Sequence, residues 1–305
     1  MQNRRTFIRQ GAGLLAGGFA LSALPVARWA SSYPPPGIQL FTFFNQIDGD
    51  VSGTLNRIAE TGYVNVESAF SKKGGYYGYK AKPFGELIKS VGLNWKSHHV
   101  LGAPFKLPPG SKMPLGADGK PLVIPPMLNL RDNMQELIDE AVAGGVEWLV
   151  CASTPVSTPD EIRASIEVLN RSDEACKKAG LRLAYHNGVA EFHEVEGKIP
   201  YQMILEGTNL KMELDLAWAI KGGHDPIDLF RHHPGRFPLW HIKDLDNTYE
   251  VVLPVGMGTI DYKSLFAAAD TAGLEYYFVE DEMPKDAWAS ITTSMKYLRQ
   301  LAPVK

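Results

Sequence analysis

Apolar and polar positions follow two alternating patterns along most of the chain. Short apolar runs are separated by longer segments in which apolar residues recur every three or four positions. The short runs are typical of buried strands, and the longer segments are typical of amphipathic helices. The runs predict strands at residues 37–44, 63–66, 93–100, 147–152, 181–187, 210–214, 237–240 and 275–279.

Helical segments lie between these strands, and several carry recognisable ends. Gly62 follows the first predicted helix, and Thr158 or Ser157 precedes the one that Gly180 ends, as expected for helix caps. Strand and helix alternate without an obvious linker, which predicts a single-domain α/β fold, a (β/α)8 TIM barrel. The alternative is a doubly wound open sheet, but no glycine-rich phosphate loop follows any strand. The helices are predicted at 51–61, 84–91, 128–143, 160–179, 201–206, 225–233, 262–272 and 287–301.

Ionisable side chains end most of the predicted strands. In a barrel of parallel strands, the carboxyl ends form the active face. One such residue alone is more often a helix cap or a loop anchor, but a set at one mouth indicates a site. The residues are Glu67, His98 or His99, His186, Asp215, His241 and Glu280.

The last four strands offer a mixed shell of oxygen and nitrogen ligands. Carboxylates and imidazoles suit a hard or borderline divalent ion rather than one that prefers thiolates. The imidazole nitrogens favour Mn²⁺, Co²⁺ or Zn²⁺ over Mg²⁺. The sequence therefore predicts a divalent metal as cofactor.

Several motifs resemble those of the xylose isomerase-like superfamily, in its sugar phosphate isomerase/epimerase branch. They span nearly the whole chain after residue 36, and the pair HIKD and VGMGTIDY is the most specific. The carrying segments are GIQLFTFF, TGYVNVE, GLNWKSHHV, LRLAYHNGVAEF, MELDLAW, HIKD, VGMGTIDY and YYFVEDE.

The resemblance implies a metal held by a carboxylate on the fifth strand, Asp on the sixth, His on the seventh and Glu on the eighth. Those positions are His186, Asp215, His241 and Glu280. Many members carry Glu where this chain has His186. Either His186 is itself a ligand, which we favour, or Glu191 reaches back to the metal. Loss of the metal is the remaining alternative.

The shared chemistry of that family is proton removal next to a carbonyl. A metal polarises the carbonyl and stabilises the enediolate, while a carboxylate or His takes the proton. Glu280 and Glu67 are the candidate carboxylates, with His99 and Lys243 as partners for the oxyanion or a hydroxyl. Alternatively, Glu67 caps a loop and Lys243 pairs with Asp244 on the surface.

Aromatic residues near the strand ends are candidates for the wall against which a sugar stacks. Phe44 and Trp218 are the predicted substrate contacts, together with Glu191. Phe70 and Tyr77 are further candidates, although aromatic residues at barrel ends are as often part of the core.

The first thirty residues have the pattern of an export signal. Arg4 and Arg5 precede Phe7 and a mildly apolar run from Gly11 to Val26, as in a twin-arginine signal. The sequence thus predicts a signal at 1–30, a catalytic barrel at 31–305 and a periplasmic location.

Composition excludes several kinds of partner. A net charge of -3 and a pI near 6.3 give no reason to expect nucleic acid or an anionic membrane.

Cys151 and Cys176 are predicted as two separate buried thiols. A Pro/Gly-rich insertion at 101–126 is too long for an ordinary loop, so it covers the mouth or forms a subunit contact in an oligomer.

The leading prediction is a metal-dependent isomerase/epimerase-type enzyme acting on a sugar or keto-sugar. Dehydration, and lyase or hydrolase cleavage of a 3-keto-glycoside, would use the same intermediate. A nuclease resembling endonuclease IV would need more ligands and a basic face. A sugar-binding barrel without metal is the rival, and Asp215→Ala would separate it from an enzyme.

Overall fold

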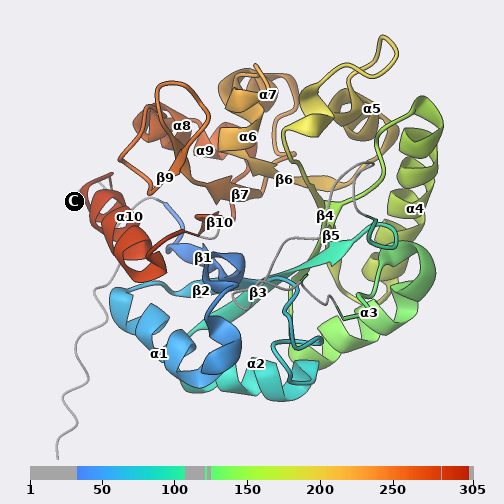
Figure 1. The fold of residues 1–305 in the computed structure, drawn as a ribbon. Helices are drawn as coiled ribbons and strands as arrows, with labels where there is room; N and C mark the ends of the chain where they lie inside the picture. Colours follow the sequence, from blue (N-terminus) through green and yellow to red (C-terminus); the bar gives the residue numbers. More distant parts are fainter. Residues whose placement is uncertain (1–32, 107–120, 122–124, 283, 302–305) are drawn as a thin grey trace, which may run out of the picture.

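The computed structural model describes residues 33–106, 121, 125–282 and 284–301, in which eight parallel strands close into a barrel (Figure 1). Going round the barrel, their order is β1, β10, β7, β6, β5, β4, β3 and β2. This closure confirms the predicted single-domain TIM barrel. The strands are β1 (Gly37–Gln39), β2 (Asn65–Ser68), β3 (Asn94–Leu101), β4 (Trp148–Ser153), β5 (Arg182–His186), β6 (Lys211–Asp215), β7 (Leu239–Ile242) and β10 (Tyr276–Val279).

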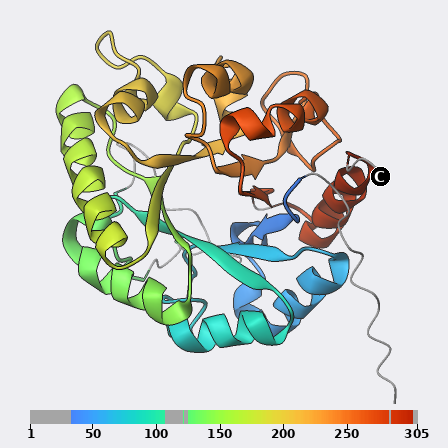
Figure 2. The ribbon, with the colours of Figure 1, turned by 180° about the vertical axis from the view of Figure 1, so that it is seen from behind.

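Helices surround the barrel, as both ribbon views show (Figures 1 and 2). The predicted caps are confirmed at two places: the Thr158 hydroxyl accepts a hydrogen bond from the Glu161 amide, and Gly62 ends its helix with φ 108°, a conformation that favours glycine. The helices are α1 (Val51–Thr61), α2 (Ala81–Ser90), α3 (Leu130–Gly144), α4 (Pro159–Lys178), α5 (Pro200–Gly207), α6 (Leu216–Lys221), α7 (Pro226–His232), α8 (Tyr262–Ala267), α9 (Ala269–Ala272) and α10 (Ala287–Leu301), with 3₁₀ turns at Leu40–Phe43, Ile47–Gly49 and Ala190–Phe192.

Two predicted elements differ from the structure. The run 37–44 is a strand only as far as Gln39 and then turns into the 3₁₀ helix Leu40–Phe43, whose start is capped by the Gln39 side chain. An apolar run fits a strand and a buried helical turn equally well, so periodicity alone could not separate them. The predicted helix 262–272 is divided at Ala268 into α8 and α9.

The inside of the barrel has two layers, because every second residue of a strand points inward. Near the amino ends of the strands the interior is apolar and is filled by Trp148, Val150, Ala184, Leu239 and Phe278. The next inward position on three of these strands carries an ionisable group instead. This cluster of ionisable groups therefore lies next to the apolar layer, which we call the plug.

A small antiparallel ribbon, β8 (Asp244–Leu245) with β9 (Val252–Leu253), connects the HIKD and VGMGTIDY motifs in the chain. The Asp244 carboxylate accepts hydrogen bonds from the backbone amides of Gly256 and Ile260. Gly258 approaches so closely that a Cβ there would lie 2.2 Å from the Leu245 carbonyl oxygen. The two motifs are thus a structural pair, in which Asp244 holds the glycine loop that follows β7.

Some predictions concern residues outside the described part of the chain. The twin-arginine signal at 1–30 lies there, as does most of the insertion at 101–126. Cys151 and Cys176 are both free and buried, which confirms the prediction of separate thiols. Among the described residues, no helix has the length and apolar character needed to cross a membrane.

Candidate metal centre and active site

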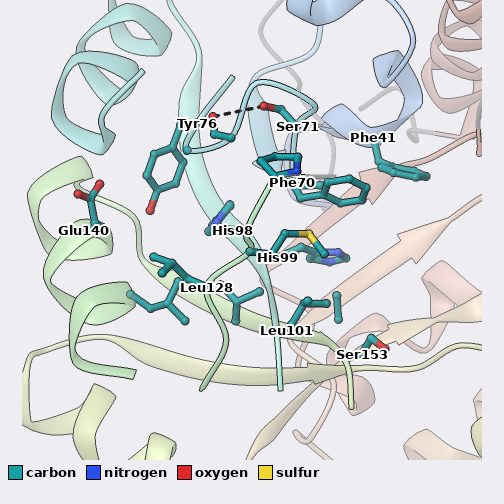
Figure 3. A pocket seen from close by; sticks show the side chains of 18 of the residues that line it. Phe41, Phe70, Ser71, Tyr76, His98, His99, Leu101, Leu128, Glu140 and Ser153 are labelled. Atoms are coloured by element: carbon teal, nitrogen blue, oxygen red, sulfur yellow. Dashed lines mark hydrogen bonds between the residues drawn. The ribbon is translucent and has the colours of Figure 1, made fainter. Parts of the chain in front are cut away.

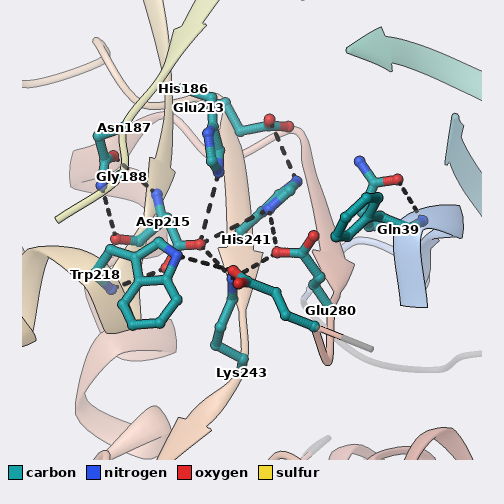
Figure 4. A network of polar contacts seen from close by, with 12 residues as sticks. Gln39, His186, Asn187, Gly188, Glu213, Asp215, Trp218, His241, Lys243 and Glu280 are labelled. Atoms are coloured by element: carbon teal, nitrogen blue, oxygen red, sulfur yellow. Dashed lines mark hydrogen bonds and ion pairs between the residues drawn. The ribbon is translucent and has the colours of Figure 1, made fainter. Parts of the chain in front are cut away.

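Ionisable side chains from five strands and from the segments that follow β7 and β10 gather at the carboxyl-terminal mouth of the barrel, and Figure 4 shows how most of them lie. Nearly all are buried, so the protein has removed several charges from water at one place. Burial of charge is unfavourable unless the charges are paired, which makes their pairing the central question. The group consists of Glu67, His99, His186, Glu213, Asp215, His241, Lys243 and Glu280.

His241 lies at the centre of the group. Its Nε2 atom is 2.5 Å from a Glu67 oxygen and 3.3 Å from a Glu213 oxygen, while its Nδ1 atom is 3.2 Å from Glu280. Burial alone would lower the pKa of His241, but the carboxylates of Glu213, Glu280 and Glu67 outweigh it and raise the pKa well above its usual range. One imidazole therefore connects three carboxylates.

His99 lies parallel to His241 and shares two of these carboxylates. The two rings stack with centroids 5.0 Å apart and planes 10° apart. The His99 Nε2 atom is 2.7 Å from Glu213 and 3.1 Å from Glu67. Burial opposes protonation of His99, but Glu67 and Glu213 raise its pKa to about 9. Burial and the neighbouring Glu67 raise the pKa of Glu213 to about 7.

Lys243 is completely buried. Its ammonium lies 2.8 Å from Asp215, 2.5 Å from Glu280 and 2.8 Å from Glu282. Although burial disfavours the charged form, these carboxylates raise the pKa of Lys243 well above its usual range. The alternative that Lys243 pairs with Asp244 on the surface is therefore wrong.

His186 is the member of the group with the fewest partners. Neither of its ring nitrogens has a hydrogen-bond partner among the described residues, and Nε2 lies 3.6 Å from Asp215 Oδ2. Burial lowers the pKa of His186 to about 4, which leaves a neutral imidazole with a free lone pair. Such a nitrogen is suited to bind a metal.

The donor atoms form two overlapping groups that could hold a cation. Within each group they lie within 4.8 Å of one another, and two ligands at about 2.0–2.2 Å from one ion are at most about 4.4 Å apart. His241 belongs to both groups. Small side-chain movements would therefore complete a mixed nitrogen and oxygen shell. The groups are His99, His186, Glu213 and His241, and Asp215, His241 and Glu280.

The ligands expected from the sequence are divided between these two groups. His186 lies in the first and Asp215 and Glu280 in the second. Glu191, the alternative to His186, lies in neither. Its carboxylate accepts hydrogen bonds from the Tyr185 hydroxyl at 3.0 Å and the Gly188 amide at 3.1 Å, which holds it away from the candidate ligands.

Glu213 is the residue that sequence reasoning missed. It lies in the strand 210–214, which reads as an apolar run, and its side chain is completely buried. The available signal was its position two residues before Asp215, because residues two apart in a strand share one face. A charge inside a buried strand, on the same face as a candidate ligand, indicates a second layer of the site.

A cavity of about 520 Å³ opens at this mouth (Figure 3). His99, His186 and Glu280 contribute to its wall, whereas Glu67 and Lys243 do not. Glu67 therefore acts on His99 and His241 from behind and does not face a substrate in the cavity. His98, the alternative to His99, also lines the cavity, and its ring pairs with the Ser68 hydroxyl.

The aromatic wall differs from the one expected. Phe41 and Phe70 line the cavity, while Phe44 packs behind both, at centroid distances of 5.1 and 5.3 Å. Trp218 is not on the wall either: its indole donates a hydrogen bond to Glu282, and its ring lies 4.8 Å from the Lys243 ammonium. Tyr77 is buried, and its hydroxyl accepts a hydrogen bond from the Ala69 amide.

Comparison with known proteins gives a family and a partial relative. Residues 55–301 match the family described as xylose isomerase-like TIM barrel. An inosose dehydratase of Geobacillus kaustophilus (strain HTA426) is 28% identical over 108 residues, which cover 35% of this chain and 34% of that protein. The chain thus matches about a third of the length of this curated relative.

Solved structures share the fold over most of the chain. A sugar phosphate isomerase/epimerase from Parabacteroides distasonis ATCC 8503 has a TM-score of 0.68 and 24% identity, covering 90% of this chain and 96% of that one. The IOLI protein with a bound zinc atom has a TM-score of 0.64 and 15% identity, covering 88% and 97%. At these identities the likeness concerns the fold.

Proposed function

The chain belongs to the xylose isomerase-like TIM barrel family, and from this premise we propose that it is a metal-dependent enzyme that removes a proton next to the carbonyl of a sugar or keto-sugar. The observation that carries the proposal is the buried cluster of carboxylates and imidazoles that opens on the cavity. Perturbed ionisable groups gathered in one pocket are characteristic of active sites.

His186, Asp215, His241 and Glu280 are the side chains that would hold the ion. When bound, a divalent ion would supply positive charge beside the substrate oxygens. Mn²⁺, Co²⁺ and Zn²⁺ fit a shell of imidazole and carboxylate better than Mg²⁺. The zinc of the IOLI structure is consistent with this choice.

The proton would be handled by groups on the cavity wall. Glu280 faces the cavity and can accept a proton from the substrate, while His99 can donate a hydrogen bond to a substrate oxygen. Glu67 and Glu213 orient His99 from behind, as partners of functional imidazoles usually do. The Lys243 ammonium keeps Asp215 and Glu280 ionised and in place.

The first test is metal content together with proton exchange. We expect about one Mn, Co or Zn per chain in the wild type, and loss of metal in the variant His186→Ala/Asp215→Ala. The wild type should exchange the proton next to the carbonyl of a keto-sugar with deuterium from solvent. The matched control is Asp228→Ala/His232→Ala on the outer helix α7, which should keep both properties.

Absence of metal from the wild type, even after reloading, would contradict this mechanism. A sugar-binding barrel would then be the better explanation, provided that sugars still bind. Binding without exchange in a metal-loaded protein would likewise exclude the enzyme.

Dehydration is the second candidate reaction, and the partial match to an inosose dehydratase favours it. Isomerisation or epimerisation conserves the mass of the substrate, whereas dehydration removes one water. Mass spectrometry of the product therefore separates the two reactions once exchange has been detected.

Export by the twin-arginine route to the periplasm is a further proposal, based on residues 1–30 alone. Replacing Arg4 and Arg5 by Lys should keep the protein in the cytoplasm. Cell fractionation would measure this, and unchanged export of the variant would overturn the proposal.

A further inference from the structure

The cavity extends beyond the candidate metal ligands. Its volume of about 520 Å³ lies within the range of about 300–1,000 Å³ that is typical of sites for drug-sized ligands. The candidate ligands occupy one end, where His99, His186 and Glu280 lie. The remaining space extends away from them, between β3 and helix α3.

Apolar side chains line this distant part, which we call the annex. It consists of the ring of Tyr76 and the side chains of Met127, Leu128 and Leu137, whereas Leu101 lies beside His99 (Figure 3). Figure 3 shows Tyr76 and Leu128 on one side of the pocket and Phe41 on the other, with His99 between them. The annex is therefore a continuation of the site and not a separate pocket.

Charged and polar side chains, including His98, line the cavity beside the apolar residues of the annex. Lys80, Glu136 and Glu140 line the cavity there, and one Glu140 oxygen accepts a hydrogen bond from the Ala81 amide. The leucine and methionine side chains offer no hydrogen-bonding group for sugar hydroxyls. An aromatic ring packed against these apolar side chains would gain from burial.

We propose that the annex is an aglycone subsite, and that the substrate is a glycoside of a keto-sugar, whose sugar ring lies at the metal end while an aromatic aglycone fills the annex. This inference rests on the proposed function for the placement of the sugar ring. One continuous cavity, with the candidate metal ligands His99, His186 and Glu280 in one part of its wall and a group of apolar side chains in another, supports it. Such a division matches a ligand with one polar and one apolar half.

The test compares matched phenyl and methyl β-glycosides of glucose and of galactose, with binding measured by calorimetry on the metal-loaded full chain. We expect the wild type to bind at least one phenyl glycoside at least about tenfold more tightly than its methyl counterpart, because the phenyl ring buries additional apolar surface. Leu128→Trp, which fills the annex, should reduce this preference to about onefold while binding of the methyl glycoside stays unchanged.

Two further variants complete the design. Val142→Trp adds the same side chain to an exposed position of α3 away from the cavity and should keep the preference. Leu128→Ala removes apolar contact from the annex and should reduce the preference for the phenyl over the methyl glycoside severalfold. This variant provides the test if Leu128→Trp does not fold. Equal affinities in the wild type, a preference that survives both Leu128 variants, or no binding of any glycoside would overturn the subsite.

Proton exchange on a free keto-hexose separates this inference from the proposed function. Exchange without a phenyl preference would reject the aglycone subsite and leave the enzymatic function standing. A phenyl preference that Leu128→Trp removes, in a protein that exchanges no proton, would support the subsite and reject the function.

Discussion

The two layers inside the barrel differ completely, although they lie two residues apart on the same strands. Leu239 and His241 occupy successive inward positions of β7. Phe278 and Glu280 occupy successive inward positions at the end of β10. The first of each pair belongs to the apolar plug and the second to the candidate metal centre. Both layers are almost inaccessible to solvent, so burial does not distinguish them.

The difference lies in what burial does to the free energy of unfolding. Full burial of a large apolar side chain stabilises the fold by about 1.5–3 kcal/mol. Burial of a charged pair removes hydration that the pairing only partly replaces, so such pairs contribute little or are unfavourable. The apolar plug therefore stabilises the barrel. The burial of charge in the candidate metal centre is explained by its catalytic chemistry instead. Three variants test this division, and a fourth tests a buried carboxyl outside both layers.

Lys243→Met should have the largest effect, because it leaves Asp215, Glu280 and Glu282 without their shared cation. Removal of one partner from a buried ion pair destabilises by about 3–5 kcal/mol. Urea unfolding without metal would measure the loss, and added Mn²⁺ should recover more stability in the variant than in the wild type. Lys221→Met, on the outer helix α6, is the control and should change stability by less than about 1 kcal/mol.

Phe278→Ala should lower the free energy of unfolding by about 3 kcal/mol, since it opens a cavity in the plug. Activity per folded molecule should stay within a few-fold of the wild type. Phe278→Leu should lose less stability because more of the volume is kept. If Phe278→Ala abolished activity while stability was unchanged, the assignment of the two layers would be reversed.

Glu213→Gln should show the opposite behaviour. The amide cannot orient His99 and His241 as a carboxylate does, so activity should fall about 10–100-fold, as for other partners of metal-site imidazoles. Stability should change little, because burial and Glu67 raise the pKa of Glu213 to about 7, so its ionised form contributes little to the free energy of unfolding. Exchange rates and urea unfolding on the same sample would measure both, and a loss of several kcal/mol with full activity would contradict the division.

Glu191→Gln should have the smallest effect, and it tests a buried carboxyl outside the two layers. Burial raises the pKa of Glu191 above its ordinary value of 4.5. The unfolded chain then releases this proton at a lower pH than the folded protein, so this carboxyl makes the free energy of unfolding fall as pH rises above about 4.5. The variant should lack this contribution, which unfolding curves at several pH values would reveal.

Glu194→Gln, on the exposed loop nearby, is the matched control and should leave the pH dependence unchanged. A wild type and a Glu191→Gln variant with parallel pH profiles would contradict the assigned shift.

Much of the fold could be predicted because its signals are local. The apolar runs, the Gly62 end and the Thr158 cap depend on residues close in sequence, and the barrel follows from their alternation. The first strand was predicted too long, since the apolar run GIQLFTFF continues from β1 into the 3₁₀ helix. Local pattern identifies burial there but not the backbone conformation.

The site could be predicted in part, for the same reason. His186 and Asp215 end β5 and β6, and His241 is the last but one residue of β7, so their common mouth follows from strand direction. Glu213 shares a face with Asp215 on β6, but its contacts with His99 and His241 could not be predicted, because they join residues on different strands. The same holds for the cavity wall, where Phe41 and not Phe44 faces the site.

The sequence by itself thus determined the element order, the barrel and the strand ends that meet at its mouth, because periodicity and chain direction are local properties. Only the tertiary structure decided which charges share a proton or a cation. Lys243 shows this most clearly: its neighbour in sequence is Asp244, yet its partners are Asp215, Glu280 and Glu282. Pairing of buried charges depends on distances across the barrel, which closure of the sheet alone sets.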